Sequence, residues 1–97
     1  MTRLVHHLSP RARAIVTAGL RRRDGDTCPY CGVTMTFNAG TEWVPSKASI
    51  EHIVPIDRGG DDTWGNLTLC CMRCNVSKQS KTAAEFVAYL AAQAVPA

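Results

Sequence analysis

Two pairs of cysteines with the spacing CxxC are the residues of this chain with the clearest chemistry. Each pair offers two thiolates at the spacing of a metal-binding knuckle, and two pairs together complete a tetrahedral sulfur shell suited to zinc. One pair alone would be weak evidence, because redox and haem motifs share the spacing, whereas two pairs are strong evidence. We therefore expect a structural Zn²⁺ held by Cys28, Cys31, Cys71 and Cys74.

A disulfide framework is the alternative use of these cysteines. The chain has five cysteines, an odd number, and its first residues lack the apolar core of an export signal, so both observations argue against disulfides. The fifth, Cys70, ends a short apolar stretch and is expected to be a small buried hydrophobe rather than a ligand. Gly32 follows the first pair, where a tight knuckle needs a positive φ.

The segment Glu51-His52-Ile53-Val54-Pro55 lies between the two pairs. A metal clamp around such a segment would hold a carboxylate, an imidazole and an amide near one another. Imidazole titrates close to neutral pH, so it can take a proton from water and make a nucleophile. Glu51 and Asn75 offer oxygen ligands, which suit Mg²⁺ or Mn²⁺ better than zinc.

Local signals predict the elements that must position these side chains. Ser9-Pro10 indicates the start of a helix with apolar residues at helical spacing, and Asp24-Gly25-Asp26 ends it. Strands are expected over residues 34–37, 48–54 and 67–70, the second of them closed by proline, and a helix over residues 72–80 follows.

A last helix is predicted near the end of the sequence. Thr82-Ala83-Ala84-Glu85 is a capping box, and Phe86, Val87 and Leu90 would form the apolar side of the helix that it opens. The central order is strand, long loop, strand, helix. The sequence therefore predicts a small α+β fold with flanking N- and C-terminal helices.

The length of 97 residues allows one small domain, 1–97, whose hydrophobic core is too small to stabilise the fold well by apolar burial alone. A structural metal would supply the missing stability. No apolar run approaches the length needed to cross a membrane, so no membrane partner is expected. The cysteine usage and the lack of an export signal favour a reducing, cytoplasmic setting.

The positive charge of the chain is unevenly distributed. The formal net charge is +3, and a zinc ion with four thiolates would contribute about −2, which leaves about +1. Basic clusters beside a metal site are compatible with a phosphate backbone as partner, although a solvated helix face explains any single arginine equally well. Six of the eleven basic residues lie in the first 23 positions, and others lie beside the second cysteine pair: Arg3, Arg11, Arg13, Arg21, Arg22, Arg23, and Arg73, Lys78, Lys81.

These motifs in this order resemble the HNH endonuclease family. The resemblance implies a ββα-metal (His-Me) finger with an additional four-cysteine zinc site, covering roughly residues 23–81 and leaving the outer helices unaccounted for. We divide the domain into a basic N-terminal helix region, 1–23, a zinc-clamped core, 24–81, and a C-terminal helix, 82–97. The residues that carry it are Cys28-x-x-Cys31, Glu51-His52-Ile53-Val54-Pro55, Gly59-Gly60, Asn66-Leu67 and Cys71-x-x-Cys74-Asn75-x-x-Lys78.

The resemblance also implies a role for each matching residue. His52 corresponds to the general base, Glu51 to the acidic metal ligand, and Asn75 to the ligand on the helix. Asn66 corresponds to the asparagine that mostly braces the long loop. Adjacent strand residues face opposite ways, so we expect Glu51 and His52 to converge only across a twisted or bulged strand.

We expect a metal-dependent endonuclease that cleaves DNA, with a structural zinc and a catalytic Mg²⁺ or Mn²⁺. Small proteins that resemble this family occur among phage and mobile-element genes, where some cooperate with a DNA-packaging terminase. The alternative is a non-catalytic treble-clef zinc module that binds nucleic acid or a protein partner, which explains the cysteines and arginines but not the Glu51-His52 pair. The predicted nucleic-acid contacts are Arg73, Lys78, Arg21, Arg22 and Arg23.

Overall fold

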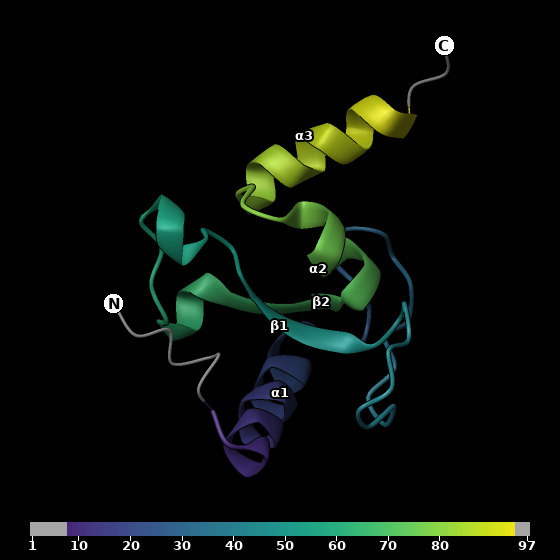
Figure 1. Ribbon diagram of the computed structural model, residues 1–97, viewed down its shortest axis with the longest axis vertical. Helices are drawn as coiled ribbons and strands as arrows, with labels where there is room; N and C mark the ends of the chain where they lie inside the picture. The colour runs from purple at the N-terminus through teal and green to yellow at the C-terminus, as the bar shows by residue number, and fades with distance from the viewer. Residues whose placement is uncertain (1–7, 95–97) are drawn as a thin grey trace.

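The polypeptide folds around a two-stranded antiparallel sheet flanked by helices, the α+β arrangement that we predicted (Figure 1). The computed structural model describes residues 8–94, so Arg3 of the predicted basic cluster lies outside the described residues. In chain order the elements are α1 (Pro10–Asp24), β1 (Ala48–His52), the 3-10 turns η2 (Ile56–Arg58) and η3 (Trp64–Asn66), β2 (Leu67–Cys71), α2 (Met72–Lys78) and α3 (Ala83–Ala94).

The helix α1 begins and ends where its sequence signals predicted. The side chain of Ser9 caps it by accepting a 3.1 Å hydrogen bond from the Ala12 N–H, and Pro10 occupies the first turn. At the other end Gly25 adopts φ 87°, a conformation that costs glycine little, and its N–H donates to the Arg21 carbonyl. The predicted N-terminal helix is therefore confirmed within the described residues.

The sheet and the helix that follows it form a ββα unit. β1 pairs with β2 in an unbroken antiparallel register from Ala48↔Cys71 to His52↔Leu67, and α2 begins at the residue after β2 ends. Figure 1 shows α1 and α2 on opposite sides of the sheet. The helix α2 ends at Lys78 rather than near residue 80, because Gln79 leaves the helical region with φ 52°.

β1 is two residues shorter than the predicted strand. Val54 lies within the predicted range, but its backbone pairs with a side chain: its N–H donates to Asn66 Oδ1 at 2.9 Å, and its carbonyl accepts from Asn66 Nδ2 at 2.9 Å. The amide of Asn66 thus replaces a partner strand, and the ladder ends at His52.

The strand predicted over residues 34–37 is wrong. This segment makes two isolated bridges, Thr27↔Thr34 and Thr36↔Lys47, to different segments and in opposite directions. Because consecutive residues never pair with the same neighbour, no ladder forms. The segment returns the chain from the cysteine knuckle to β1.

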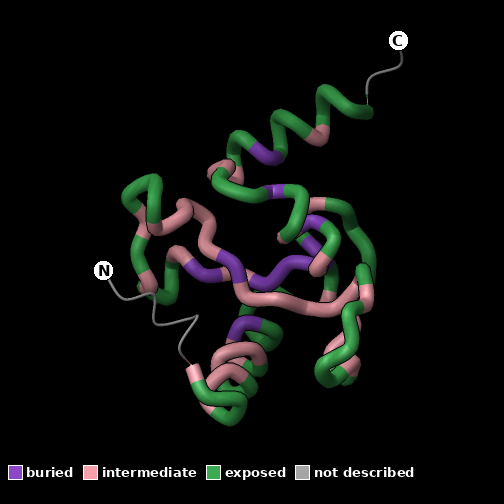
Figure 2. The backbone as a smooth tube through the Cα atoms, in the orientation of Figure 1, coloured by how far each residue is buried: buried purple, intermediate pink, exposed green. Residues whose placement is uncertain are grey.

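The core lies along β2, most of whose residues are buried, whereas most residues of β1 are half-buried (Figure 2). One residue each from α1 and α3 completes it, Leu20 and Phe86, both 0 % exposed. The edge of the Tyr30 ring meets the Phe86 ring at a centroid distance of 5.0 Å, which joins α3 to the first cysteine knuckle.

The helix α3 opens with the predicted capping box. Thr82 N–H donates to Glu85 Oε1 at 2.9 Å, and Glu85 N–H donates to Thr82 Oγ1 at 3.1 Å. Phe86 and Leu90 pack on the core as predicted, but Val87 is 54 % exposed, so its assignment to the apolar side is wrong.

Hydrogen bonds from Arg58 and Thr82 lower the pKa of Glu85 to about 2, and the Arg58 pair ties η2 to α3. Across residues 8–94, no helix has both the length and the apolar content that crossing a membrane requires.

Candidate active site and zinc clamp

The four cysteines of the two CxxC pairs converge at one point. Their Sγ atoms all lie within 4.8 Å of one another, and Cys31 Sγ is 3.6 Å from Cys71 Sγ. Tetrahedral thiolates at a Zn–S distance of about 2.3 Å would be about 3.8 Å apart, so this donor set fits zinc. The first pair comes from the knuckle after α1, Cys71 ends β2, and Cys74 lies in α2.

Backbone N–H groups point at these sulfur atoms. The Cys71 N–H donates to Cys28 Sγ at 3.5 Å, and the Cys74 N–H donates to Cys71 Sγ at 3.4 Å. Burial opposes ionisation of Cys28, but several such donors outweigh it and lower the pKa of that thiol to about 7. Burial raises the pKa of Cys71 and Cys74, so the cluster needs a bound cation to hold four thiolates together.

The fifth cysteine and the knuckle glycine behave as predicted. Cys70 is 0 % exposed within the core, and burial raises the pKa of its thiol, so it is a buried hydrophobe outside the metal cluster. Gly32 adopts φ 80°, the left-handed conformation expected after the second cysteine of the knuckle.

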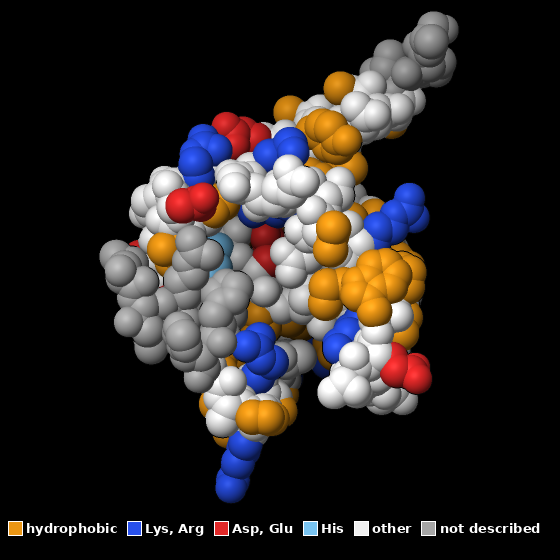
Figure 3. Space-filling view, viewed as in Figure 1, with side chains coloured by type: hydrophobic (Ala, Val, Ile, Leu, Met, Phe, Trp, Pro, Cys, Tyr) orange, Lys and Arg blue, Asp and Glu red, His pale blue; other side chains and the backbone are white. Residues whose placement is uncertain are grey.

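A second site is a cavity of about 300 Å³ between the end of β1 and α2, lined by Glu51, His52 and Asn75 among others. β1 supplies the carboxylate and the imidazole, and the middle of α2 supplies the amide. Figure 3 shows this face, where acidic, basic and histidine side chains meet around a central hollow. The structure therefore brings these three predicted residues to one cavity.

Glu51 and His52 reach the same cavity without the bulge that we considered. Their ladder is regular, with Glu51 opposite Thr68 and His52 opposite Leu67. His52 is the last residue of the ladder, and beyond it the Ile53 N–H makes a further backbone bond, to the Asn66 carbonyl just before β2. Because the cavity lies at this end of the strand, two neighbouring side chains can both line it.

Glu51 is a buried charge with two partners. Its side chain is 3 % exposed, one carboxylate oxygen accepts a hydrogen bond from the Tyr30 hydroxyl, and the other lies 3.0 Å from Lys78 Nζ. Burial and the nearby carboxylate raise the pKa of Tyr30, so the phenol remains a donor. A buried carboxylate is tolerated only when such groups compensate it.

Lys78 lies in a different environment from the solvated or phosphate-contacting side chain that we predicted. Its residue is 3 % exposed, and Nζ also donates to the His52 carbonyl at 2.9 Å. Lys78 thus fastens α2 to the end of β1, and its ammonium is directed at the acid of the cavity. Tyr30 was missed altogether, because nothing in a CPYC knuckle indicates a contact 21 residues further along the chain.

His52 has an acidic partner that the sequence analysis missed. Its Nε2 lies 2.7 Å from Asp62 Oδ1, and both side chains are largely buried, at 9 % and 15 % exposure. A carboxylate at Nε2 favours the tautomer with the proton on that nitrogen, which makes Nδ1 the basic atom. The only sequence signal was an acidic pair, Asp61-Asp62, in a loop of unknown path.

A glycine allows the long loop to bring Asp62 back to His52. A Cβ atom on Gly60 would lie 1.8 Å from the Val54 carbonyl oxygen, so no other residue fits there without a backbone shift. Asn66 then fixes the loop: besides its two bonds to Val54, its Nδ2 donates to the Asp61 carbonyl at 2.8 Å. These contacts are those of a brace, outside the cavity itself.

The predicted nucleic-acid contacts fall into two groups. Arg21 forms a bidentate pair with Asp26 at 2.7 and 3.0 Å, and Arg23 pairs with Asp24 and donates to the carbonyls of η3 and β2. Arg23 therefore ties α1 to the sheet. Arg22 and Arg73 are exposed.

Two comparisons with known proteins bear on this site. The model of the HNH endonuclease family matches residues 28–81, which include both cysteine pairs and the whole cavity wall from β1 to α2. The chain is also 38 % identical over 58 residues to the CRISPR-associated endonuclease Cas9 of Corynebacterium diphtheriae. That stretch is 59 % of this chain and 5 % of the Cas9 protein, so the chain spans only a small part of that relative.

Proposed function

The chain belongs to the HNH endonuclease family, and we propose that it is a metal-dependent endonuclease that hydrolyses phosphodiester bonds in DNA. The observation that carries the proposal is the meeting of a carboxylate, an imidazole and an amide in one cavity, beside a cluster of four cysteines. A small domain of this kind needs such a clamp, because its own core is limited.

His52 is the proposed general base. With its Nε2 proton directed at Asp62, Nδ1 accepts a proton from water as the water oxygen attacks phosphorus and the bond to the leaving ester oxygen breaks. Asp62 holds the imidazole in that tautomer and stabilises the imidazolium that forms. The leaving oxygen takes a proton from solvent, so the products are an alcohol and a phosphomonoester.

Glu51 and Asn75 are the proposed ligands of a divalent cation. A carboxylate oxygen and an amide oxygen are donors that Mg²⁺ and Mn²⁺ accept, with waters and substrate phosphate completing the shell. The cation would stabilise negative charge on the phosphate and on the leaving oxygen. Without a bound cation, the hydrogen bond from Tyr30 and the ion pair with Lys78 compensate the buried charge of Glu51.

A plasmid assay tests the proposal. Zinc-loaded protein is incubated with supercoiled plasmid, with no added cation and with Mg²⁺ or Mn²⁺, and nicked and linear forms are separated on a gel. We expect nicking that requires the added cation. A protein that binds the plasmid but leaves it intact with every cation would instead be the non-catalytic zinc module.

Replacing Asp62 by asparagine is expected to lower kcat about 10- to 100-fold with little change in KM. A hydrogen bond to a charged partner contributes about 1.5–3 kcal/mol, and the amide neither fixes the tautomer nor stabilises the imidazolium. Asp61→Asn is the matched control, because the Asp61 carboxylate accepts its hydrogen bonds from Thr63 and not from His52. Equal effects of the two substitutions on kcat would refute the role of Asp62.

Replacing Lys78 by methionine is expected to destabilise the fold by about 3–5 kcal/mol, because it leaves the Glu51 carboxylate buried without its ammonium partner. The double variant Glu51→Gln/Lys78→Met should recover most of that loss. Mn²⁺ should stabilise the single variant in urea more than it stabilises the wild type. Lys81→Met, outside the cavity, is the control. An Mn²⁺ effect equal in variant and wild type would contradict Glu51 as a cation ligand.

The biological setting stays a prediction. If the protein serves a DNA-packaging machine of a phage, tagged protein should co-purify with a terminase from cells that express both. Recovery of the nuclease without terminase at matched expression would count against that association.

A further inference from the structure

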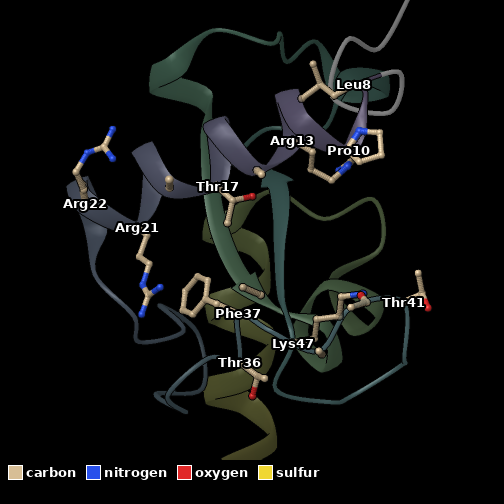
Figure 4. A pocket seen from close by; sticks show the side chains of 15 residues that line it. Leu8, Pro10, Arg13, Thr17, Arg21, Arg22, Thr36, Phe37, Thr41 and Lys47 are labelled. Atoms are coloured by element: carbon tan, nitrogen blue, oxygen red, sulfur yellow. The ribbon is translucent and has the colours of Figure 1, made fainter.

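A larger groove lies away from the catalytic cavity, between α1 and the segment 36–48 that precedes and enters β1 (Figure 4). Its volume is about 800 Å³. Figure 4 shows Thr17 and Arg21 projecting from α1 toward the segment that carries Phe37 and Lys47, with Arg13 toward the other end of the groove from Arg21 and Arg22. The HNH match to residues 28–81 leaves α1, one whole wall of the groove, outside it.

The groove carries charge of one sign. Four of its lining residues are basic, Arg13, Arg21, Arg22 and Lys47, and among the described residues no acidic side chain lines it. Asp26 offsets the charge of Arg21. Of the other three basic residues, Arg13 and Arg22 lie on the α1 wall, and Lys47 lies on the wall that leads into β1. Lys47 is held in place by donating to the Gly40 carbonyl at 2.6 Å. A ligand with several negative charges fits such walls.

Apolar side chains lie between these cations. Ala14, Ala18, Ala48 and Phe37 line the groove, and the Arg21 guanidinium lies 4.0 Å from the centre of the Phe37 ring. Because the Asp26 carboxylate accepts two hydrogen bonds from one edge of that guanidinium, the stacked pair is held in place before any ligand arrives. A ligand made of flat apolar groups joined by negatively charged links therefore fits a groove with an apolar floor and basic walls.

We propose that this groove binds a single-stranded segment of the DNA substrate. A single strand can lay unpaired bases on the apolar floor while its phosphates meet the arginines and the lysine. A duplex keeps its bases paired inside and offers the floor only its backbone. This proposal rests on the proposed function, because it states that the DNA reaching the catalytic cavity is single-stranded.

The position of β1 connects the groove to the cavity. Ala48, the first residue of β1, lines the groove, whereas Glu51 and His52 at its other end line the catalytic cavity. Three or four strand residues span about 10–13 Å. A strand held in the groove can therefore pass round the open edge of β1 and present a phosphodiester a few nucleotides away.

Fluorescence anisotropy with a labelled 15-nucleotide oligo(dT) tests this, using zinc-loaded protein without Mg²⁺ or Mn²⁺. We expect the single strand to bind more tightly than a duplex of equal length. Arg13→Glu/Arg22→Glu should weaken that binding about tenfold or more and lower the slope of log K against log salt by about 0.7 for each phosphate that the variant no longer neutralises. Arg11→Glu, on the same helix but outside the groove, is the matched control.

Ala18→Trp fills the floor without changing charge, and it should weaken oligo(dT) binding by a similar factor even if the charge reversals disturb α1. The proposal would be overturned if Arg11→Glu weakened binding as much as the double variant, or if the duplex bound more tightly than oligo(dT). It would also be overturned if polyglutamate displaced the labelled oligo(dT) as well as unlabelled oligo(dT) does. Groove-dependent binding by a protein that never cleaves plasmid would uphold the groove and overturn the nuclease, so the two proposals fail separately.

Discussion

Replacing His52 by alanine is expected to lower the rate of plasmid cleavage by about 10²- to 10⁴-fold, the usual contribution of a positioned general base. The side chain is 9 % exposed and lines the catalytic cavity, and its Nε2 is committed to Asp62. The acid beside it, Glu51, already accepts from Tyr30 and pairs with Lys78, so it is poorly placed to replace the base. Initial rates of nicking at saturating Mn²⁺ measure the loss.

Ser80→Ala is the matched control for this substitution, because Ser80 also lines the cavity but no proposed step uses its hydroxyl. Thermal denaturation of both variants verifies that each is folded. Partial rescue of His52→Ala by added imidazole would support proton transfer as the missing function. Wild-type nicking rates in a folded, zinc-loaded His52→Ala protein would refute the proposed base.

Removing the zinc is expected to unfold the protein. Three of the four clamp cysteines, Cys28, Cys71 and Cys74, belong to the same buried cluster as the side chains of β2, so the clamp is part of the core. Structural zinc contributes an apparent binding free energy of about 10–16 kcal/mol at neutral pH, which is as large as the whole stability of a typical domain. Chelation, or the substitution Cys74→Ser, should therefore abolish the cooperative unfolding transition.

Cys70→Ala is the matched control for the clamp, because Cys70 is equally buried but lies outside the four-sulfur cluster. We expect this variant to keep one zinc per chain by elemental analysis, although it loses some stability from the cavity it creates. Metal-free protein with the circular dichroism and urea transition of the zinc-loaded form would show that the cysteines do not clamp the fold.

The predictions that succeeded rest on local chemistry. The Ser9-Pro10 start of α1 and the Thr82–Glu85 capping box are hydrogen-bond patterns closed within four residues, so their residue types determine them. Gly32 in its knuckle is equally local. The cysteine cluster joins distant residues, but two CxxC pairs leave few other ways to satisfy four thiols.

The predictions that failed concern contacts between residues that lie far apart in the sequence. The Tyr30–Glu51–Lys78 cluster joins three elements, and the His52–Asp62 pair depends on a loop path that Gly60 and Asn66 fix. Val54 was assigned to a strand because its sequence suits one, yet an asparagine side chain takes its backbone groups. A buried lysine cannot be told from a solvated one by its neighbours in sequence.

The convergence of Glu51, His52 and Asn75 was predicted from the cysteine clamp and from the resemblance, since the spacing of these three residues alone does not bring position 75 back to positions 51 and 52. The regular β1–β2 register and the direct β2–α2 junction supply the physical reason. Because β2 ends opposite Ala48, α2 starts beside the start of β1 and runs back along the strand until Lys78 reaches the His52 carbonyl. Strand alternation was a weaker guide, because it does not hold where a ladder ends.

X-ray diffraction at the manganese edge, from crystals of zinc-loaded protein soaked in Mn²⁺, tests most directly whether this cavity is the catalytic metal site. We predict an anomalous peak in the cavity, with oxygen atoms of Glu51 and Asn75 as its protein ligands and the His52 imidazole beside it. A well-occupied Mn²⁺ held by other residues, or a cavity without a peak at a concentration that supports DNA cleavage, would contradict this assignment.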